Sequence, residues 1–248
     1  MIDINIYPAY KQFEPLIKLF PPVQANKFLP EWYKNQKSTL TKQYMQTNQT
    51  DGKYAKDCPA IQELITDGII IPAWSDVYIY KWEGKLHWRV PLGDLTGSGK
   101  NEDEPLIEEH FIKQAQGMEL NLAKDVGVLK LVSPYNIVTP DGYGVEVSDP
   151  FYHHRRNIKV LPGKVETDIW HYMQFPFEFY SKDVDFKKEV AVIKAGEPLL
   201  MINAYKKDNE TNLILNNFDK DIHKKQFENT VLKCSLSHDF KRYRKEKS

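Results

Sequence analysis

The sequence predicts a mainly β protein with a smaller helical part, an α+β chain. Seven short apolar or alternating runs between residues 126 and 206 are separated by turns that contain Pro or Gly. Strands at this spacing are typical of a sandwich or barrel, and not of alternating β/α units. Aromatic residues make up 12% of the 248 residues, with Tyr the most frequent, and such side chains suit a pleated surface.

Composition divides the chain into three consecutive segments. We expect residues 1–125 to form an N-terminal α/β portion packed on the core, residues 126–215 to form the β core, and residues 216–248 to form a C-terminal helix with a basic tail. Together they are expected to make one compact unit, because a chain of this length can bury a substantial core.

Local patterns predict the first elements. Apolar residues alternate over residues 4–8, which predicts a short strand. Pro30 stands where a first helical residue would, so residues 30–37 are expected to form a short helix. Residues 38–57 carry few apolar groups and predict a loop.

The clearest helix is predicted between Pro59 and Gly68, because Pro favours a helix start and Gly a helix end. A buried strand is expected to follow at residues 69–72. Residues 76–92 predict a β-hairpin that turns at Glu83 and Gly84.

The middle of the chain predicts a loop, a helix and then strands. Residues 93–105 are Gly-rich and acidic, and their GSGK lacks the spacing of a phosphate-binding P-loop. Residues 105–117 are expected to be helical. The strands of the core are expected in the seven runs 126–133, 135–140, 143–148, 157–161, 175–180, 189–196 and 197–205.

Composition also limits the partners and the compartment. The formal net charge is zero and the pI is about 7.1, so binding to nucleic acid or to an anionic membrane is not expected. Cys58 and Cys234 lie in no metal-binding spacing, which favours free thiols in a reducing compartment. With no signal-peptide pattern at the N-terminus, we expect a cytoplasmic protein, in the host cytoplasm if the chain is viral.

Two turns and a pair of carboxylates suggest a site. Pro140-Asp141-Gly142 predicts a turn in which Gly takes a positive φ. A second turn at Pro162-Gly163 is expected to lead into a strand with Glu166 and Asp168 on one face. Paired carboxylates on a rigid strand suit a magnesium-bound phosphate, a ribose hydroxyl or an activated water.

Residues 135–206 resemble the core of the trimeric dUTPase and dCTP-deaminase superfamily. The matches are to its P-x-G-Y turn, its G-x-I-D-x-D hairpin and its I-x-x-G-D-x-I strand: Pro140, Gly142, Tyr143; Gly163, Val165, Glu166, Asp168; Ile193, Gly196, Glu197, Leu199. The chain is also similar to an uncharacterised β-rich family of bacteriophages and bacteria, through its TP-x-GY and NFPF-like segments. The superfamily resemblance implies a β-clip or jelly-roll-like core, a homo-oligomer such as a trimer, and Mg²⁺ with a nucleotide.

The same resemblance implies roles for individual residues. Glu166 occupies the position of the water-activating aspartate, and Tyr143 would line the pocket. Glu is one methylene longer than Asp, which displaces a general base. Ile169 stands where the family has an aromatic residue that stacks on the sugar, although Trp170 is next to it. The family's A-R-S-G phosphate turn is replaced here by residues 148–157.

The segment 153–171 allows two further interpretations. His153 or His154, with His171 and Asp168, would supply the two His and one carboxylate of a non-haem Fe²⁺ site. Arg155 and Arg156 would instead suit an anion, because the planar guanidinium binds phosphate oxygens in pairs. An ordinary polar sheet surface explains the same residues without any ligand.

Three functional hypotheses follow. The first is a viral dUTPase-like protein that binds a nucleotide or another phosphorylated small molecule, with Arg155, Arg156, Glu166, Asp168 and Tyr143 around a pocket and Trp170 beside it. The second is a metal-dependent oxygenase or cupin-like enzyme. The third is a non-catalytic assembly or virion-associated protein with an aromatic, Arg-containing contact surface.

Overall fold

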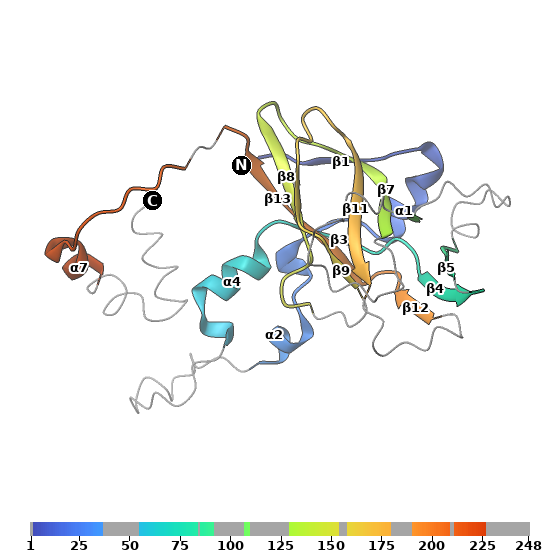
Figure 1. Ribbon diagram of the computed structural model, residues 1–248, viewed down its shortest axis with the longest axis horizontal. Helices are drawn as coiled ribbons and strands as arrows, with labels where there is room; N and C mark the ends of the chain where they lie inside the picture. The colour runs from blue at the N-terminus through green and yellow to red at the C-terminus, as the bar shows by residue number, and fades with distance from the viewer. Residues whose placement is uncertain are drawn as a thin grey trace. The chain divides into compact units, whose positions relative to one another are not determined.

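A computed structural model of the chain describes residues 2–36, 55–83, 85–91, 107–109, 129–153, 158–179, 190–208 and 211–226. The protein is mainly β and built from antiparallel sheets, as predicted (Figure 1). It divides into two compact units. The first comprises residues 1–28 and 68–208, and the second comprises residues 29–67 and 209–248.

The first unit contains three sheets, in which every described strand pair is antiparallel. The first sheet has the order β1 (Asn5–Pro8), β7 (Leu129–Val138), β11 (Tyr172–Phe179), β9 (Ile158–Val160), with β6 (Ile107–Glu109) also paired to β7. The second has the order β10 (Gly163–Val165), β8 (Tyr143–Ser148), β13 (Pro198–Lys206), β3 (Ile69–Pro72), β2 (Val23–Gln24). The third has the order β12 (Val190–Ile193), β4 (Val77–Trp82), β5 (Lys85–Arg89).

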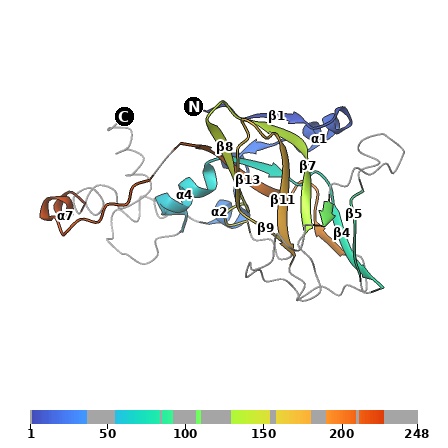
Figure 2. The same cartoon turned by 45° about the horizontal axis from the view of Figure 1, so that its top comes forward.

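The main core of this unit draws side chains from all three sheets. Ile137 and Phe177 of the first sheet are fully buried, as are Leu200 of the second and Ile79 of the third. In β4 and β11 alternate residues face the core, so the period-two pattern of the sequence becomes one apolar face per strand. In β13 the four consecutive residues 199–202 are buried, so this strand is covered on both faces. Figure 2 shows β7 and β11, which supply much of this core, running side by side.

Short helices complete both units. The first unit has η1 (Lys11–Phe13), α1 (Glu14–Leu19) and η2 (Ala25–Lys27), and the second has α2 (Glu31–Asn35), η3 (Ala55–Asp57), α4 (Pro59–Thr66) and α7 (Lys220–Gln226). The helix predicted after Pro59 is confirmed as α4, and Gly68 follows it with φ +84°. The predicted hairpin is confirmed as β4 and β5, and the predicted C-terminal helix as α7. None of the helices in the described ranges is long and apolar enough to cross a membrane.

Two predictions of helices and strands outside the candidate site are wrong. The helix predicted from residue 105 is a strand at Ile107–Glu109, because Ile107 pairs with Leu131 and is buried; the rest of that prediction lies outside the described residues. The two runs on either side of Pro134 form one strand, β7, and not two.

A bulge allows β7 to continue through Pro134. The register with β11 shifts between Tyr172 and Gln174, so Pro134 needs no ladder hydrogen bond there. The Ser133 hydroxyl donates to the carbonyl of Tyr135 at 2.9 Å and accepts from its N–H at 3.0 Å. This side chain therefore replaces the hydrogen bonds that the bulge removes from the buried backbone.

Candidate functional site

The turn after β10 carries both predicted acidic residues. β10 ends at Val165, so Glu166 and Asp168 lie in this turn, and the prediction that they share a strand face is wrong. The N–H groups of Ile169 and Trp170 both donate to the carbonyl of Glu166, at 3.1 and 2.8 Å. These bonds close the turn and fix the backbone positions from which the Glu166 and Asp168 side chains extend.

Asp168 joins this turn to the predicted Pro140–Tyr143 turn. Its carboxylate accepts a hydrogen bond from the N–H of Gly142 at 2.9 Å, and its side chain is only 6% exposed. Gly142 has φ +78°, a left-handed conformation that favours Gly, so the predicted turn is confirmed. Asp168 thus has a structural task that the sequence did not indicate.

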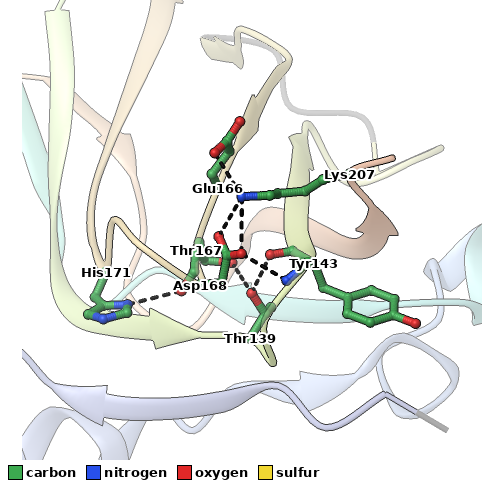
Figure 3. A network of polar contacts seen from close by, with 8 residues as sticks. Thr139, Tyr143, Glu166, Thr167, Asp168, His171 and Lys207 are labelled. Carbon is green, nitrogen blue, oxygen red and sulfur yellow. Dashed lines mark hydrogen bonds and ion pairs between the residues drawn. The ribbon is translucent and has the colours of Figure 1, made fainter. Parts of the chain in front are cut away.

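Lys207 completes the site and was not identified from the sequence. Its ammonium group lies 2.9 Å from Glu166 Oε2 and 3.1 Å from Asp168 Oδ2 (Figure 3). The N–H of Lys207 donates to the carbonyl of Gly142 at 2.9 Å, which holds the end of β13 beside the turn. We call Glu166, Asp168 and Lys207 the carboxylate–lysine cluster.

The contacts within the cluster shift the pKa values of Lys207 and Asp168. The hydrogen bonds to Glu166 and Asp168 raise the pKa of Lys207, so it stays protonated at neutral pH. Burial acts to raise the pKa of Asp168, but the Lys207 ammonium and the Gly142 N–H outweigh it and hold that pKa below its usual value. Asp168 and Lys207 therefore form an ion pair at neutral pH. Counted formally, two carboxylates and one ammonium group give the cluster one net negative charge.

Two buried threonines stabilise the turn through their hydroxyl groups. Thr139, at the end of β7, and Thr167 are buried, and their hydroxyl oxygens lie 2.8 Å apart. The Thr139 hydroxyl is also 2.8 Å from the carbonyl of Tyr143. His171 Nδ1 lies 2.9 Å from the carbonyl of Thr167 (Figure 3). The backbone on which Glu166 and Asp168 stand is therefore held at several points.

The remaining predicted residues are not all gathered here. Tyr143 borders the cluster, but in Figure 3 its ring extends away from the carboxylates. Ile169 and Trp170 are 71% and 63% exposed at the tip of the turn. His153 is half-buried, with its ring centroid 6.1 Å from that of Phe28.

Several residues of the metal and anion interpretations lie between His153 and Ile158, in a stretch of the chain that the structure does not describe. His154, Arg155 and Arg156 lie outside the described residues. Within the described residues, no group of three or more His, Cys, Asp or Glu side chains is arranged to hold a metal ion. No model of a known protein family matches the chain, and a search among curated proteins found no match.

Proposed function

We propose that this chain is a dUTPase-like protein of viral type that binds a nucleotide or another phosphorylated small molecule at the carboxylate–lysine cluster. The proposal includes the finer arrangement that the resemblance implies, a β-clip or jelly-roll-like core in a homo-oligomer. The observation that carries it is that the Glu166 carboxylate is both exposed to solvent and held in place by an ion pair. This carboxylate is 59% exposed, yet it is held at 2.9 Å by Lys207.

The chemistry of the cluster favours binding through a hydroxyl or a bound cation. Glu166 offers acceptor oxygens to a sugar hydroxyl or to a magnesium ion carried by a phosphate. Lys207 has three N–H donors, and a ligand oxygen would share them with Oε2 of Glu166 and with both carboxylate oxygens of Asp168. A bare phosphate is disfavoured, because the cluster is negative overall.

The same contacts argue for binding and against efficient hydrolysis. A general base must reach the attacking water with a free oxygen and a suitable pKa. Asp168 is engaged by Gly142 and Lys207, and Glu166 shares the same ammonium. We therefore expect ligand binding without rapid turnover of dUTP.

Isothermal titration calorimetry tests the proposal. The ligands are dUTP, dCTP, dTTP, ATP and dUMP, each with MgCl₂ and again with EDTA. We expect one of the triphosphates to bind with Mg²⁺, and Glu166→Gln to weaken that binding about tenfold, because a charge-assisted contact is lost. Glu146→Gln is the matched control, since Glu146 is an exposed carboxylate on β8. Absence of binding across the panel at about 1 mM ligand, or equal losses in both variants, refutes the proposal.

A second candidate function rests on Ile169 and Trp170. A rigid turn that exposes two large apolar side chains resembles an anchor for a protein partner, because little ordering entropy remains to be lost on binding. An assembly protein would use such an anchor between its own copies. Light scattering after size-exclusion chromatography tests this: Ile169→Ser/Trp170→Ser should reduce the molar mass of the particle, and an unchanged mass contradicts the assembly role.

A further inference from the structure

The solvent face of the first sheet carries an aromatic–amide–aromatic row that shares no residue with the carboxylate–lysine cluster. Tyr7 of β1 lies opposite Asn136 of β7, and Asn136 lies opposite Tyr172 of β11 on its other side. Directly opposed residues share one face of a sheet, so the three side chains form a continuous line. We call them the tyrosine row.

Burial shows that this face points to solvent. Tyr7 is 54% exposed, and Asn136 and Tyr172 are half-buried. The residues next to them along the strands, Ile137 and Met173, are buried in the core. The alternation of a strand therefore places the tyrosine row on the outer surface.

The strand positions that flank the row are uncharged. Asn5 and Val138 pair on one side of it, and Gln174 and Val132 pair on the other. Next to Gln174, the ammonium group of Lys130 lies 3.2 Å from its Oε1. An anionic ligand would find no matching cation in the row itself, whereas a neutral ligand loses nothing by the absence of charge.

The spacing of the row suits a chain of sugar rings. Neighbouring strands lie about 4.8 Å apart, so the two tyrosines stand about 10 Å apart across Asn136. This distance is close to the repeat of two pyranose rings in an extended polysaccharide. Each tyrosine ring can lie against the apolar C–H face of a sugar, because Tyr combines a flat apolar body with a polar tip. Between them, the Asn136 amide offers donors and an acceptor to sugar hydroxyls.

We infer that the tyrosine row is a binding site for an extended, neutral polysaccharide, with two sugar rings on Tyr7 and Tyr172 and the ring between them hydrogen-bonded to Asn136. This site is independent of the nucleotide proposal, since it shares no residue with the carboxylate–lysine cluster. A protein surface is the competing occupant of such a row, because interfaces are also rich in Tyr.

Affinity electrophoresis of the full chain tests the inference, in native gels containing hydroxyethyl cellulose, glucomannan or glycogen. We expect retardation by at least one of the extended β-linked polymers, and none by glycogen, whose chains coil. Tyr7→Ala should lower the association constant about tenfold, and Tyr7→Phe should retain it, because the ring carries the contact. Retardation should also be the same at low and high salt.

Tyr10→Ala is the matched control, because Tyr10 is 45% exposed and lies outside the row. Equal losses for Tyr7→Ala and Tyr10→Ala overturn the inference, as does the absence of retardation by every polymer. Sedimentation of the same samples distinguishes a protein occupant of the row from a polysaccharide. If the wild-type chain is a dimer and Tyr7→Ala dissociates it, the row belongs to a subunit interface and the inference is wrong. Because Tyr7 is an exposed residue on β1, the edge strand of the first sheet, neither variant at this position should impair folding.

Discussion

The buried hydroxyl pair of Thr139 and Thr167 allows a prediction whose sign follows from hydrogen-bond logic. The carbonyl of Tyr143 can only accept, so the proton on Thr139 must point to it across 2.8 Å. The Thr167 hydroxyl must then donate to the oxygen of Thr139, across the second 2.8 Å contact. The two threonines therefore have unequal roles, although the contact between them looks symmetric.

Valine replaces either hydroxyl without changing the shape of the side chain. Thr167→Val removes one donor and leaves the Thr139 proton satisfied, so it should cost about 0.5–1.5 kcal/mol of unfolding free energy. Thr139→Val breaks the bond to Tyr143 and also leaves the buried Thr167 hydroxyl without an acceptor. That stranded group adds about 1–3 kcal/mol to the cost, so Thr139→Val should be the more damaging change.

The stability of the double variant tests the assigned proton directions. Replacing both hydroxyls removes the stranded donor, so Thr139→Val/Thr167→Val should be more stable than Thr139→Val alone. Urea unfolding followed by fluorescence measures all four proteins, with a constant m-value as the condition for comparison. A double variant that is less stable than Thr139→Val, or a Thr167→Val that is the worse single variant, refutes the assigned proton directions.

Two further predictions concern the turns around the cluster. Gly142→Ala should cost about 1–2 kcal/mol of stability, because φ is +78° but an added Cβ meets no atom within 4 Å. Gly144→Ala should cost more in the same urea assay, since its Cβ would lie 2.5 Å from the carbonyl of Val165; equal costs would contradict the steric argument. The lowered pKa of Asp168 stabilises the fold above its ordinary value of 3.8, and this contribution is lost as the pH falls through the lower pKa of the folded state. The stability difference between the wild-type chain and Asp168→Asn should therefore shrink on acidification from pH 6 to pH 3, and a difference that grows would refute the ion pair.

Local patterns in the sequence were sufficient for much of the fold. Short apolar runs placed β3 and β13, alternating residues placed β4 and β8, and the Pro140–Gly142 turn followed from the need for a positive φ. These features depend on residues that are close together along the chain. The strand at Ile107–Glu109 could not be found in this way, because its pairing with β7 overrides a pattern that also suits a helix.

The candidate site shows the same limit. Glu166 and Asp168 were identified because two acids follow a Pro-Gly turn, but Lys207 lies in an ordinary stretch of the C-terminal half. Only the register of β13 on β8, in which Lys206 lies opposite Tyr143, brings Lys207 to the Gly142 turn. No local signal marks this lysine, so the charge balance of the cluster could not be derived before the sheet was known.

The order of the strands along the chain also determines when each can pair during synthesis. β1 and β3 are made early, but their partners Val138 and Met201 follow about 130 residues later. Until then the Ile-rich β3 can pair only with the two-residue β2 on its other edge, whereas the β4–β5 hairpin can close as soon as it is made. A nascent chain that has not yet reached β13 therefore presents an apolar strand with one edge unpaired. Such a strand is a site for chaperone binding or for aggregation, and the rate of its capture by β13 governs the yield of folded protein.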